Sequence, residues 1–392
     1  MTNKKKIGIV TYWESNDNYG QQLQCWALQY YLRSQGYNAF LIRQYVWPPM
    51  SKTLIKRIKS WIKNIIANIL YITHLAYVPF IAKYFKFCLN KETCRRRFPL
   101  FRRKHLKMTK IYDHPHKLVQ NPPQADVYIT GSDQVWNYSM PEEPLSNFFL
   151  QFGEDSVKRI SYAPSIGHAN IPDSLTEKLS DYLSRFSAIS VRESSAVSLV
   201  EKLGYHATSV LDPTMLLCAD DYLKLAKNEK GKKSVFIYSM NYESRDDIPF
   251  DAIRQFATNH ELPIIVTPGS GYTQAKELFE EVKYSYATIP QWITHIANAE
   301  LVVTASFHGV VFAILFHRSF IYTPLKGQHA SANNRVLDLL HELGLSTQIY
   351  SKSIEIGCYE ISKEQWQNAI NKLNVLINHS KRYLVTAIDG EN

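Results

Sequence analysis

The chain has 392 residues, of which 45% are hydrophobic and 20% are charged. These values are typical of globular proteins and exclude the disordered and fibrous classes. Because single hydrophobic cores rarely grow beyond about 300 residues, we expect two domains.

The net charge of +10 is concentrated in one segment. Residues 51–110 contain 16 Lys and Arg residues against a single acidic residue, Glu92. Outside this segment, acidic residues outnumber basic ones. The charge therefore indicates one local basic surface and does not favour nucleic acid as a partner.

The cysteines and the N-terminus bear on the compartment. The five cysteines are odd in number and scattered, without a CxxC pair or a histidine spacing that suits zinc. We therefore expect reduced thiols, a cytoplasmic protein and no bound metal. Three lysines at positions 4–6 precede only a short apolar run, so we expect no secretory signal.

Apolar β-branched runs alternate with helical patterns along most of the chain. Residues 7–12 and 37–43 are typical of strands that flank a helix at 20–35, which is a βαβ unit. Further strands are expected at 127–130, 160–163, 188–191, 208–211, 235–240, 263–267, 301–305 and 320–322, and further helices at 195–203, 253–258, 291–298 and 307–316. This order predicts an α/β fold with two Rossmann-like domains that face a cleft.

The domain boundary is expected near residue 217. Residues 1–217 would form the first domain, and residues 218–392 would form the second. The turn of Asp212 and Pro213 between them is predicted to be an interdomain hinge. The last helical stretch, at 363–377, has no strand after it, so we expect it to pack back across the junction.

Residues 51–110 interrupt the alternation. Apolar residues recur there at helical spacing, with lysines and an arginine between them: Leu54, Ile55, Ile58, Trp61, Ile62, Ile65, Ile66 and Ile69. This pattern predicts a basic amphipathic helical insertion. An uncharged run between Lys63 and Lys83 contains polar residues and a proline, which favours an interfacial segment over a spanning one.

Three interpretations of the insertion stay open. A basic cluster follows the apolar run and suits anionic headgroups or a diphosphate: Arg95, Arg96, Arg97, Arg102, Arg103 and Lys104. The insertion is thus expected to contact a membrane surface through residues 54–104. Alternatively it is a helical hairpin that packs on its own domain, and nucleic acid binding is the least favoured option.

The most informative stretch is LVVTASFHGVVFAIL at 301–315, in which an apolar strand leads into a helix. His308 would lie in the first turn of that helix, where free backbone N–H groups attract anions. Ser306 is positioned to cap the helix, and Gly309 would let an anion approach the backbone. The alternative is a helix cap under which His308 only fills space.

Two other strand ends carry polar side chains. Arg192 follows one strand, and its planar guanidinium suits a carboxylate or phosphate unless it forms an ion pair with Glu193 or Asp212. Asp133 follows another strand, where it is placed to accept a proton from a sugar hydroxyl or merely to cap the turn. Near it, Trp136 is expected to stack on a sugar ring.

Six motifs occur in a characteristic order: NYGQQLQCWAL at 18–28, GSDQVW at 131–136, SVRE at 190–193, VLDPT at 210–214, SFHG at 306–309 and RVLDLLHELGL at 335–345. Together they resemble the polysaccharide pyruvyl transferase family over nearly the whole chain outside residues 47–120. The resemblance implies a fold similar to that of GT-B glycosyltransferases, a phosphoenolpyruvate donor, no metal or other cofactor, and a glycan acceptor.

The resemblance also assigns roles to residues. It implies that Arg192, His308 and Arg335 bind phosphoenolpyruvate, and we add Ser306 and Gly309 from the helix start. His308 is the expected general acid or phosphate clamp, with Asp133 as the candidate base. The acceptor is expected to bind on the side of residues 1–217 and to contact Asn18, Tyr19, Gln21 and Trp136, while residues 218–392 are expected to contribute to the donor site.

The expected reaction transfers a pyruvyl group to a hydroxyl pair of a sugar in a surface or capsular polysaccharide precursor and forms a cyclic ketal. A lipid-linked acceptor would place the enzyme on the inner face of the cell membrane as a peripheral protein. Two alternatives remain: a nucleotide-sugar glycosyltransferase of GT-B type, and a non-enzymatic scaffold for glycan assembly. Binding of a nucleotide sugar, or of no donor at all, would distinguish them.

Overall fold

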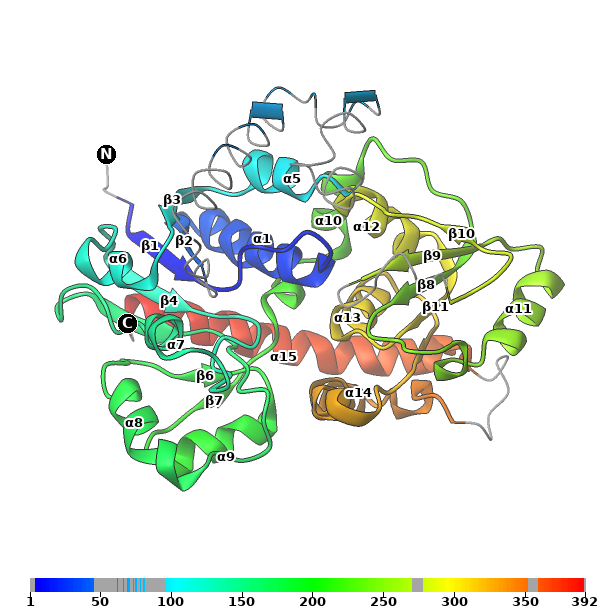
Figure 1. Ribbon diagram of the computed structural model, residues 1–392. Coiled ribbons are helices and arrows are strands. Elements are labelled where there is room, and N and C mark those ends of the chain that lie inside the picture. The colour runs from blue at the N-terminus through cyan, green and yellow to red at the C-terminus, as the bar shows by residue number, and fades with distance from the viewer. Residues whose placement is uncertain are drawn as a thin grey trace.

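The computed structural model describes residues 4–45, 96–269, 278–351 and 359–390, together with single positions between 62 and 81. Its strands form two five-stranded sheets in which all neighbouring strands are parallel (Figure 1). The first sheet has the order β3 (Met108–Tyr112), β2 (Asn38–Gln44), β1 (Lys6–Val10), β4 (Val127–Thr130) and β5 (Lys158–Ser161), and the second has β10 (Lys283–Tyr284), β9 (Ile264–Pro268), β8 (Ser234–Ser239), β11 (Ala299–Thr304) and β12 (Phe320–Tyr322). The prediction of an α/β fold with two Rossmann-like parallel sheets is confirmed.

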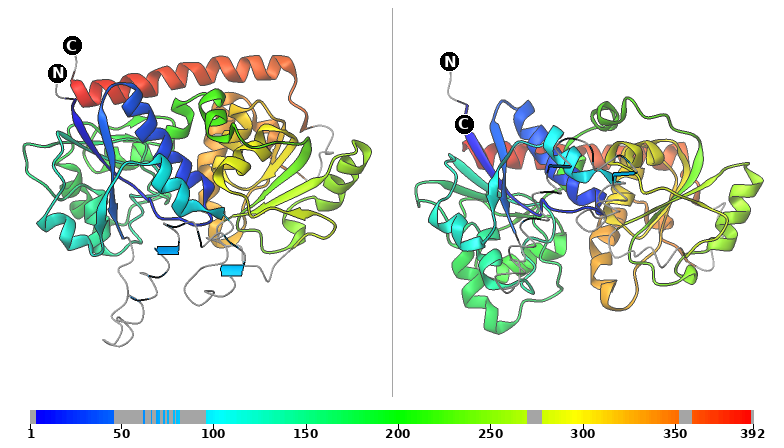
Figure 2. Two further views of the ribbon diagram at one scale, coloured as in Figure 1. Left: turned by 90° about the horizontal axis from the view of Figure 1, so that it is seen from above. Right: turned by 45° about the horizontal axis from the view of Figure 1, so that its top comes forward.

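Helices connect these strands and cover both faces of each sheet (Figures 1 and 2). They are α1 (Tyr19–Ser34), α5 (Phe98–His105), α6 (Pro115–Gln120), α7 (Glu142–Phe148), α8 (Asp173–Leu183), α9 (Ser194–Lys202), α10 (Ala219–Ala226), α11 (Phe250–Asn259), α12 (Ile289–Ala297), α13 (Phe307–Leu315), α14 (Asn334–Leu343) and α15 (Lys363–Asp389). Because helices cover both faces, central strands such as β1 and β8 are buried throughout their apolar runs.

Both sheets reverse their strand order at the same relative place. In the first sheet the reversal lies between β1 and β4, and in the second it lies between β8 and β11. Ligands of open α/β sheets bind outside the carboxyl ends of strands at such a point. A short parallel pair, β6 (Ser190–Val191) with β7 (Thr208–Ser209), continues beyond β5 through a bridge from Ile160 to Ala188.

The C-terminal helix α15 contacts elements of both sheets (Figure 2). Near its end, Tyr383 donates a hydrogen bond to the carbonyl of Ser161 at 3.0 Å, and the backbone N–H of Leu211 donates to the Ser380 hydroxyl at 2.9 Å. Its first half packs against α14. The helix is longer than the expected stretch of 363–377, because buried residues such as Leu384 recur beyond a polar interruption at 379–381.

Most of the predicted basic amphipathic helix lies outside the described residues. At the end of the insertion, two arginines of the predicted basic cluster point into the protein. Arg96 is 2% exposed and donates to the hydroxyl of Tyr19 and the carbonyl of Pro268, both at 2.7 Å. Arg102 is buried and bonds to the carbonyl of Ser15. The assignment of these two arginines to a lipid headgroup is therefore wrong, because their guanidinium groups are used to attach α5 to the body of the protein.

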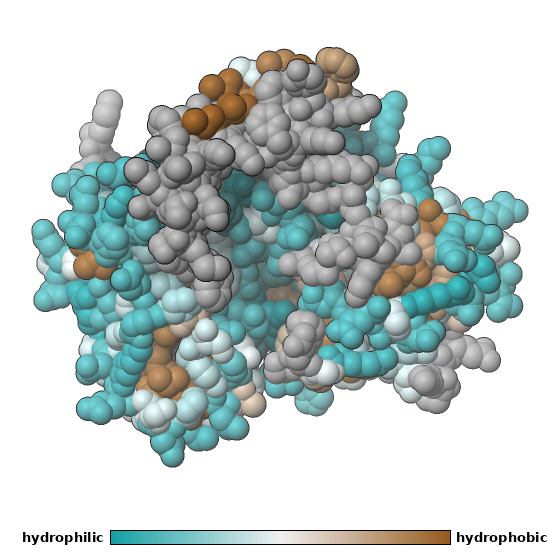
Figure 3. Space-filling view, viewed as in Figure 1, coloured by the Kyte–Doolittle hydropathy of each residue, from teal (hydrophilic) through white to brown (hydrophobic). Residues whose placement is uncertain are grey.

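No helix in the described part of the chain is both long and apolar enough to cross a membrane. Figure 3 shows the molecule hollowed between its two halves, with mostly hydrophilic residues around the hollow.

Candidate active site

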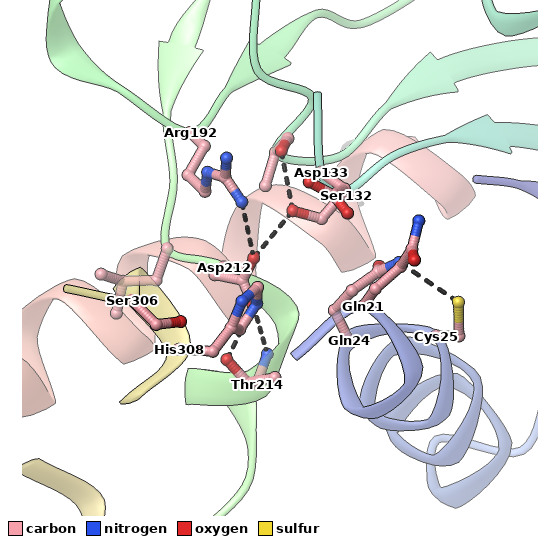
Figure 4. A network of polar contacts seen from close by, with 12 residues as sticks. Gln21, Gln24, Cys25, Ser132, Asp133, Arg192, Asp212, Thr214, Ser306 and His308 are labelled. Atoms are coloured by element: carbon pink, nitrogen blue, oxygen red, sulfur yellow. Dashed lines mark hydrogen bonds and ion pairs between the residues drawn. The ribbon is translucent and has the colours of Figure 1, made fainter. Parts of the chain in front are cut away.

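Side chains from four strand ends meet between the two sheets (Figure 4). Ser132 and Asp133 follow β4, Arg192 follows β6, and Asp212 follows β7. His308 enters from the second sheet, in the first turn of α13 after β11. Since the carboxyl ends of parallel strands lie on one edge of a sheet, the fold brings together residues that are up to 176 positions apart in sequence.

Asp212 is the centre of this polar network. Its Oδ2 accepts hydrogen bonds from Arg192 Nη1 at 3.2 Å and from the Ser132 hydroxyl at 2.9 Å. Its Oδ1 accepts from the backbone N–H and the hydroxyl of Thr214 at 3.0 and 2.7 Å. Burial alone would raise the pKa of Asp212, but the neighbouring His308 and Arg192 outweigh it and hold the pKa well below its ordinary value. The carboxylate is therefore ionised at neutral pH.

His308 faces this carboxylate from the other half of the molecule. Its Nε2 lies 3.7 Å from Asp212 Oδ1, an ion-pair distance that is slightly too long for a hydrogen bond. The imidazole is 8% exposed, and within the described part of the chain Nε2 has no hydrogen-bond partner. An imidazole held beside a fixed carboxylate is placed to act as a general acid or base.

Gly20, in the first turn of α1, makes room for His308. A Cβ atom built at Gly20 would overlap Cγ and Nδ1 of the imidazole. The backbone of α1 therefore packs directly against the ring, and the two halves meet at this contact. Any side chain at position 20 must displace His308.

We expect the substitution Gly20→Ala to lower turnover about 100-fold, because a displacement of the imidazole by about 1 Å has this order of effect. The overpacked contact should also cost about 1–3 kcal/mol of unfolding free energy. Steady-state kinetics and urea unfolding measure the two effects. In a His308→Gly background, which also removes the Cβ that lies 2.6 Å from the added atom, the same substitution should cost almost nothing further, and an equal cost in both backgrounds would contradict the contact.

Two guanidinium groups lie near the aromatic ring of Phe307. Arg192 is 4.9 Å and Arg335 is 5.8 Å from the ring centroid. Arg192 forms ion pairs with Glu193 at 3.3 Å and with Asp212 at 3.2 Å, so both of the expected ion-pair partners are present, and donor binding by Arg192 stays a prediction. Burial lowers the pKa of Arg192, but the two carboxylates outweigh burial and raise it.

Arg335 has no such partners. Its Nε is buried without a hydrogen-bond partner, and the described residues offer it no ion pair. Burial and the charge of Arg192 lower the pKa of Arg335, yet a guanidinium stays charged at neutral pH. Arg192, Asp212, Phe307 and Arg335 all line a cavity of about 460 Å³ between the halves. His308 does not line it but contacts Asp212, which does.

The family can be assigned from the sequence match. A model of the family described as polysaccharide pyruvyl transferase matches residues 18–326. The chain belongs to the polysaccharide pyruvyl transferase family. The match includes Arg192, Asp212 and His308, but it ends before Arg335.

Solved structures similar to this pyruvyl transferase family member share its fold. A putative UDP-N-acetylglucosamine 2-epimerase from Listeria monocytogenes aligns with a TM-score of 0.53 and 7% identity, covering 100% of this chain and 98% of its own. The UDP-N-acetylglucosamine 2-epimerase from Rickettsia bellii aligns with a TM-score of 0.51 and 8% identity, covering 98% and 97%. These identities support similarity of the GT-B-like fold alone. No curated protein matches the chain significantly.

The helix start of this pyruvyl transferase family member differs in one respect from the expectation. The Ser306 hydroxyl does cap α13, since it accepts from the N–H of Gly309 at 3.4 Å. The space beside Gly309, however, is filled by the side chain of Thr304. The missing Cβ of Gly309 thus accommodates Thr304, and an anion at the backbone of this helix start stays a prediction.

Two of the four expected acceptor contacts are buried in the core. Trp136 is 2% exposed, and its ring stacks on Phe149 with centroids 4.9 Å apart. Tyr19 is fully buried, stacks on Trp292 with centroids 5.3 Å apart, and donates to the carbonyl of Ala287 at 2.6 Å. The acceptor roles of Trp136 and Tyr19 are therefore wrong, since neither ring has a face free for a sugar.

The remaining expected residues lie close to the network. Asn18 caps α1 by accepting from the N–H of Gln21 at 3.1 Å, and the side chain of Gln21 lines a second cavity. Asp133 has a positive φ of 70°, and its Oδ1 accepts from the N–H of Gln134 at 2.9 Å. Asp133 thus caps its own turn, and its role as a base stays a prediction.

Asp212 and Gly20 are site residues that the sequence patterns did not predict. The turn of Asp212 was predicted to be a hinge. Its position between a strand and a proline, within one of the family motifs, was the signal that could have indicated a site residue. Nothing in the sequence marks the contact of Gly20 with His308. Within the described ranges, no group of three or more His, Cys, Asp or Glu side chains is arranged to hold a metal ion.

Proposed function

We propose that this protein transfers a pyruvyl group from phosphoenolpyruvate to two hydroxyl groups of a sugar in a polysaccharide precursor, forming a cyclic ketal. The observation that carries the proposal is Arg335, a charged guanidinium with a buried Nε that has no hydrogen-bond partner among the described residues. Arg335 is half-buried at the wall of the cavity, and a guanidinium there without a carboxylate partner among the described residues is suited to bind an anion. Arg192 lies against the same aromatic ring, and a donor with a carboxylate and a phosphate supplies two anionic groups.

The proposed chemistry begins with protonation of the terminal methylene carbon of phosphoenolpyruvate. This step leaves an oxocarbenium-like centre at the neighbouring carbon, which one sugar hydroxyl attacks while losing its proton. Phosphate then leaves with its electron pair, and the second hydroxyl attacks the same carbon and loses its proton. The products are the ketal and inorganic phosphate.

Named groups would serve these steps. His308 would act as the general acid or clamp the phosphate, with Asp212 stabilising the protonated imidazole at 3.7 Å. Arg192 and Arg335 would hold the anionic donor in one orientation. For Arg192 to bind the donor, its ion pair with Glu193 or the one with Asp212 must lengthen, so that the guanidinium can also contact the donor. Asp133 is the candidate base for a sugar hydroxyl.

Calorimetric titration tests the choice of donor. Phosphoenolpyruvate should bind the wild-type protein, and UDP-galactose should not. Binding of UDP-galactose with no binding of phosphoenolpyruvate would instead support the nucleotide-sugar glycosyltransferase, for which the GT-B-like fold is equally suited. Binding of neither compound would support the scaffold and contradict the proposed donor.

We further propose that the acceptor is lipid-linked and that the insertion contacts the membrane surface. Five described positions of the insertion expose large apolar side chains: Ile62, Ile69, Leu75, Val78 and Phe80. Figure 3 shows hydrophobic residues at the top of the molecule, where the pieces of the insertion lie in Figure 1. Lys104 on α5 is exposed on the same segment.

Vesicles that contain phosphatidylglycerol should therefore bind the protein at low ionic strength and release it as salt is added. Lys104→Ala should weaken this binding about fivefold, the equivalent of about 1 kcal/mol per basic residue. Cosedimentation measures the binding, and Lys202→Ala, an exposed lysine at the end of α9, is the matched control. No binding at low salt, or equal loss in both variants, would contradict membrane contact through the insertion.

A further inference from the structure

A second cavity, of about 420 Å³, lies in the N-terminal half next to the polar network. Its walls come from the carboxyl ends of β1 and β2, from the first turn of α1 and from the loop after β4: Tyr12, Trp13, Glu14, Gln21, Gln44, Tyr45, Asn137, Ser139 and Met140. This is the edge of the first sheet where its strand order reverses, and its size suits a small organic ligand.

Aromatic rings form one part of the wall, and they are held rigidly. The indole Nε1–H of Trp13 donates to the carbonyl of Gln44 at 2.7 Å, and its ring packs against Tyr45 with centroids 6.0 Å apart. Arg43 and Arg102 lie against the Trp13 ring, 5.5 and 5.8 Å from its centroid. A wall of fixed aromatic rings provides flat apolar surface at little cost in conformational entropy.

Gln44, one of the residues that line the cavity, has a buried side-chain donor without a partner among the described residues. Its side chain is 1% exposed, and its Oε1 accepts from Asn147 Nδ2 at 2.7 Å. Asn147 Nδ2 also donates to the carbonyl of Pro115 at 3.0 Å, which fixes the orientation of both amides. Gln44 Nε2 is therefore a donor, and it has no partner among the described residues. A buried amide without a partner is costly unless a ligand or water completes it.

The other polar groups are side chains that bond hydroxyls well. Glu14 is exposed at the cavity, where its carboxylate can accept two hydrogen bonds from neighbouring hydroxyls. Gln21 and Asn137 add amide groups that both donate and accept. Aromatic surface combined with amides and one carboxylate matches a ring that carries several hydroxyl groups. Glu14 is the acidic side chain of the lining and disfavours an acidic sugar, whereas Arg43 and Arg102, which act on the charge of Glu14, do not line the cavity.

The cavity lies beside the network that contains His308. Gln21 directly follows Gly20, whose backbone packs against the imidazole. Tyr12, on the opposite wall, donates to the carbonyl of Gln134 at 3.0 Å, directly after Asp133. A further chain of hydrogen bonds runs from Gln24 to Thr11 at 3.0 Å and on to the carbonyl of Ser132 at 2.9 Å. A ligand in the cavity would thus contact Gln21 and Tyr12, of which Gln21 directly follows Gly20 and Tyr12 bonds to the residue after Asp133.

We propose that this cavity binds an uncharged hexose residue of the glycan acceptor, with Glu14 and Gln21 as its specificity-determining contacts. The proposal rests on the pyruvyl transfer proposed above, and it names the sugar class and the place where the sugar is held. In this proposal the acceptor contacts Glu14 and Gln21, which line the cavity, in place of Tyr19 and Trp136, which are buried.

The test compares Glu14→Ala and Gln21→Ala with the wild type, and uses Glu201→Ala, an exposed glutamate on α9, as the matched control. The probes are the p-nitrophenyl glycosides of galactose and N-acetylmannosamine, followed by saturation-transfer NMR, together with a galacturonide. Phosphoenolpyruvate binding is measured separately by calorimetry on the same proteins.

At least one neutral glycoside should bind the wild type and the Glu201→Ala control equally. Glu14→Ala should weaken that binding about 10- to 100-fold, the effect of losing hydrogen bonds to a charged group. Gln21→Ala should weaken it less, and the galacturonide should bind the wild type more weakly than the galactoside does. Phosphoenolpyruvate should bind all four proteins equally.

Three results would overturn the cavity as the acceptor site: no glycoside binding to the wild type, unchanged binding to both cavity variants, or tighter binding of the galacturonide than of either neutral sugar. Loss of phosphoenolpyruvate binding in Glu14→Ala would also overturn it, because the cavity would then belong to the donor. If the wild type binds the glycoside at this cavity but never binds phosphoenolpyruvate, the cavity stands and the proposed reaction fails.

Discussion

Replacing His308 with alanine is expected to lower turnover about 100- to 10,000-fold, the usual contribution of a positioned general acid or base. The imidazole is 8% exposed, lies 3.7 Å from Asp212 Oδ1, and packs on the backbone of Gly20. Its removal leaves Asp212 with the hydrogen bonds of Arg192, Ser132 and Thr214, so the carboxylate stays satisfied. We therefore expect the fold to persist.

Circular dichroism and urea unfolding should show a folded His308→Ala protein with a normal cooperative transition. The matched control is His341→Ala, in which an exposed histidine on α14 is removed, and its turnover should equal that of the wild type. An His308→Ala protein that is folded and as active as the control would remove His308 from the reaction.

Replacing Asp212 with asparagine is expected to have the largest effect on stability. The Asp212 side chain is fully buried, and the Arg192 side chain is 2% exposed. Removing one partner of a buried ion pair typically costs about 3–5 kcal/mol, because the other charge stays buried. Glu193 remains beside Arg192, so the lower end of that range is expected. Turnover should also fall, since His308 loses the carboxylate that stabilises its protonated form.

The pH dependence of stability distinguishes this charge effect from a packing defect. An unfolded aspartate has a pKa of about 3.9, and the pKa of folded Asp212 lies well below that value. Its contribution is therefore fully present above the unfolded pKa and is lost as the pH falls through the acidic range toward the folded pKa. The stability difference between the wild type and Asp212→Asn should be constant near neutral pH and shrink below about pH 4.

The control is Asp155→Asn, which removes an ion pair with Arg185 in which the aspartate side chain is 95% exposed. An exposed pair contributes about 0–1 kcal/mol, so this variant should unfold almost like the wild type. If Asp212→Asn proved as stable as Asp155→Asn, the buried ion pair between Asp212 and Arg192 would not stabilise the fold.

The predicted strands and helices were mostly correct because buried parallel strands have continuous apolar runs. That pattern located His308, Ser306 and Arg192 at strand ends, and the structure brings them together between the two sheets. The domain boundary near residue 217 stays a prediction. Short strands such as β6 and β7 were expected to be longer, because apolar residues continue beyond the paired positions.

Other parts of the site depend on contacts between distant segments, which local patterns do not encode. An aromatic residue near a strand end has the same sequence signal whether it faces a ligand or the core, so Tyr19 and Trp136 were misplaced. Arg96 and Arg102 looked like part of an exposed basic cluster, but their buried hydrogen bonds appear only once α5 lies on the body of the protein. The contacts of Asp212 with Ser132, Arg192 and His308 involve three segments that meet only in the folded chain.

The most direct test of the central claim is phosphate release from phosphoenolpyruvate with a panel of galactose- and mannosamine-containing lipid-linked acceptors, measured for wild type and His308→Ala side by side. We predict that phosphate is released only when an acceptor of the right sugar is present, and that His308→Ala abolishes most of the release. Consumption of a nucleotide sugar without phosphate release from phosphoenolpyruvate would contradict the proposed reaction.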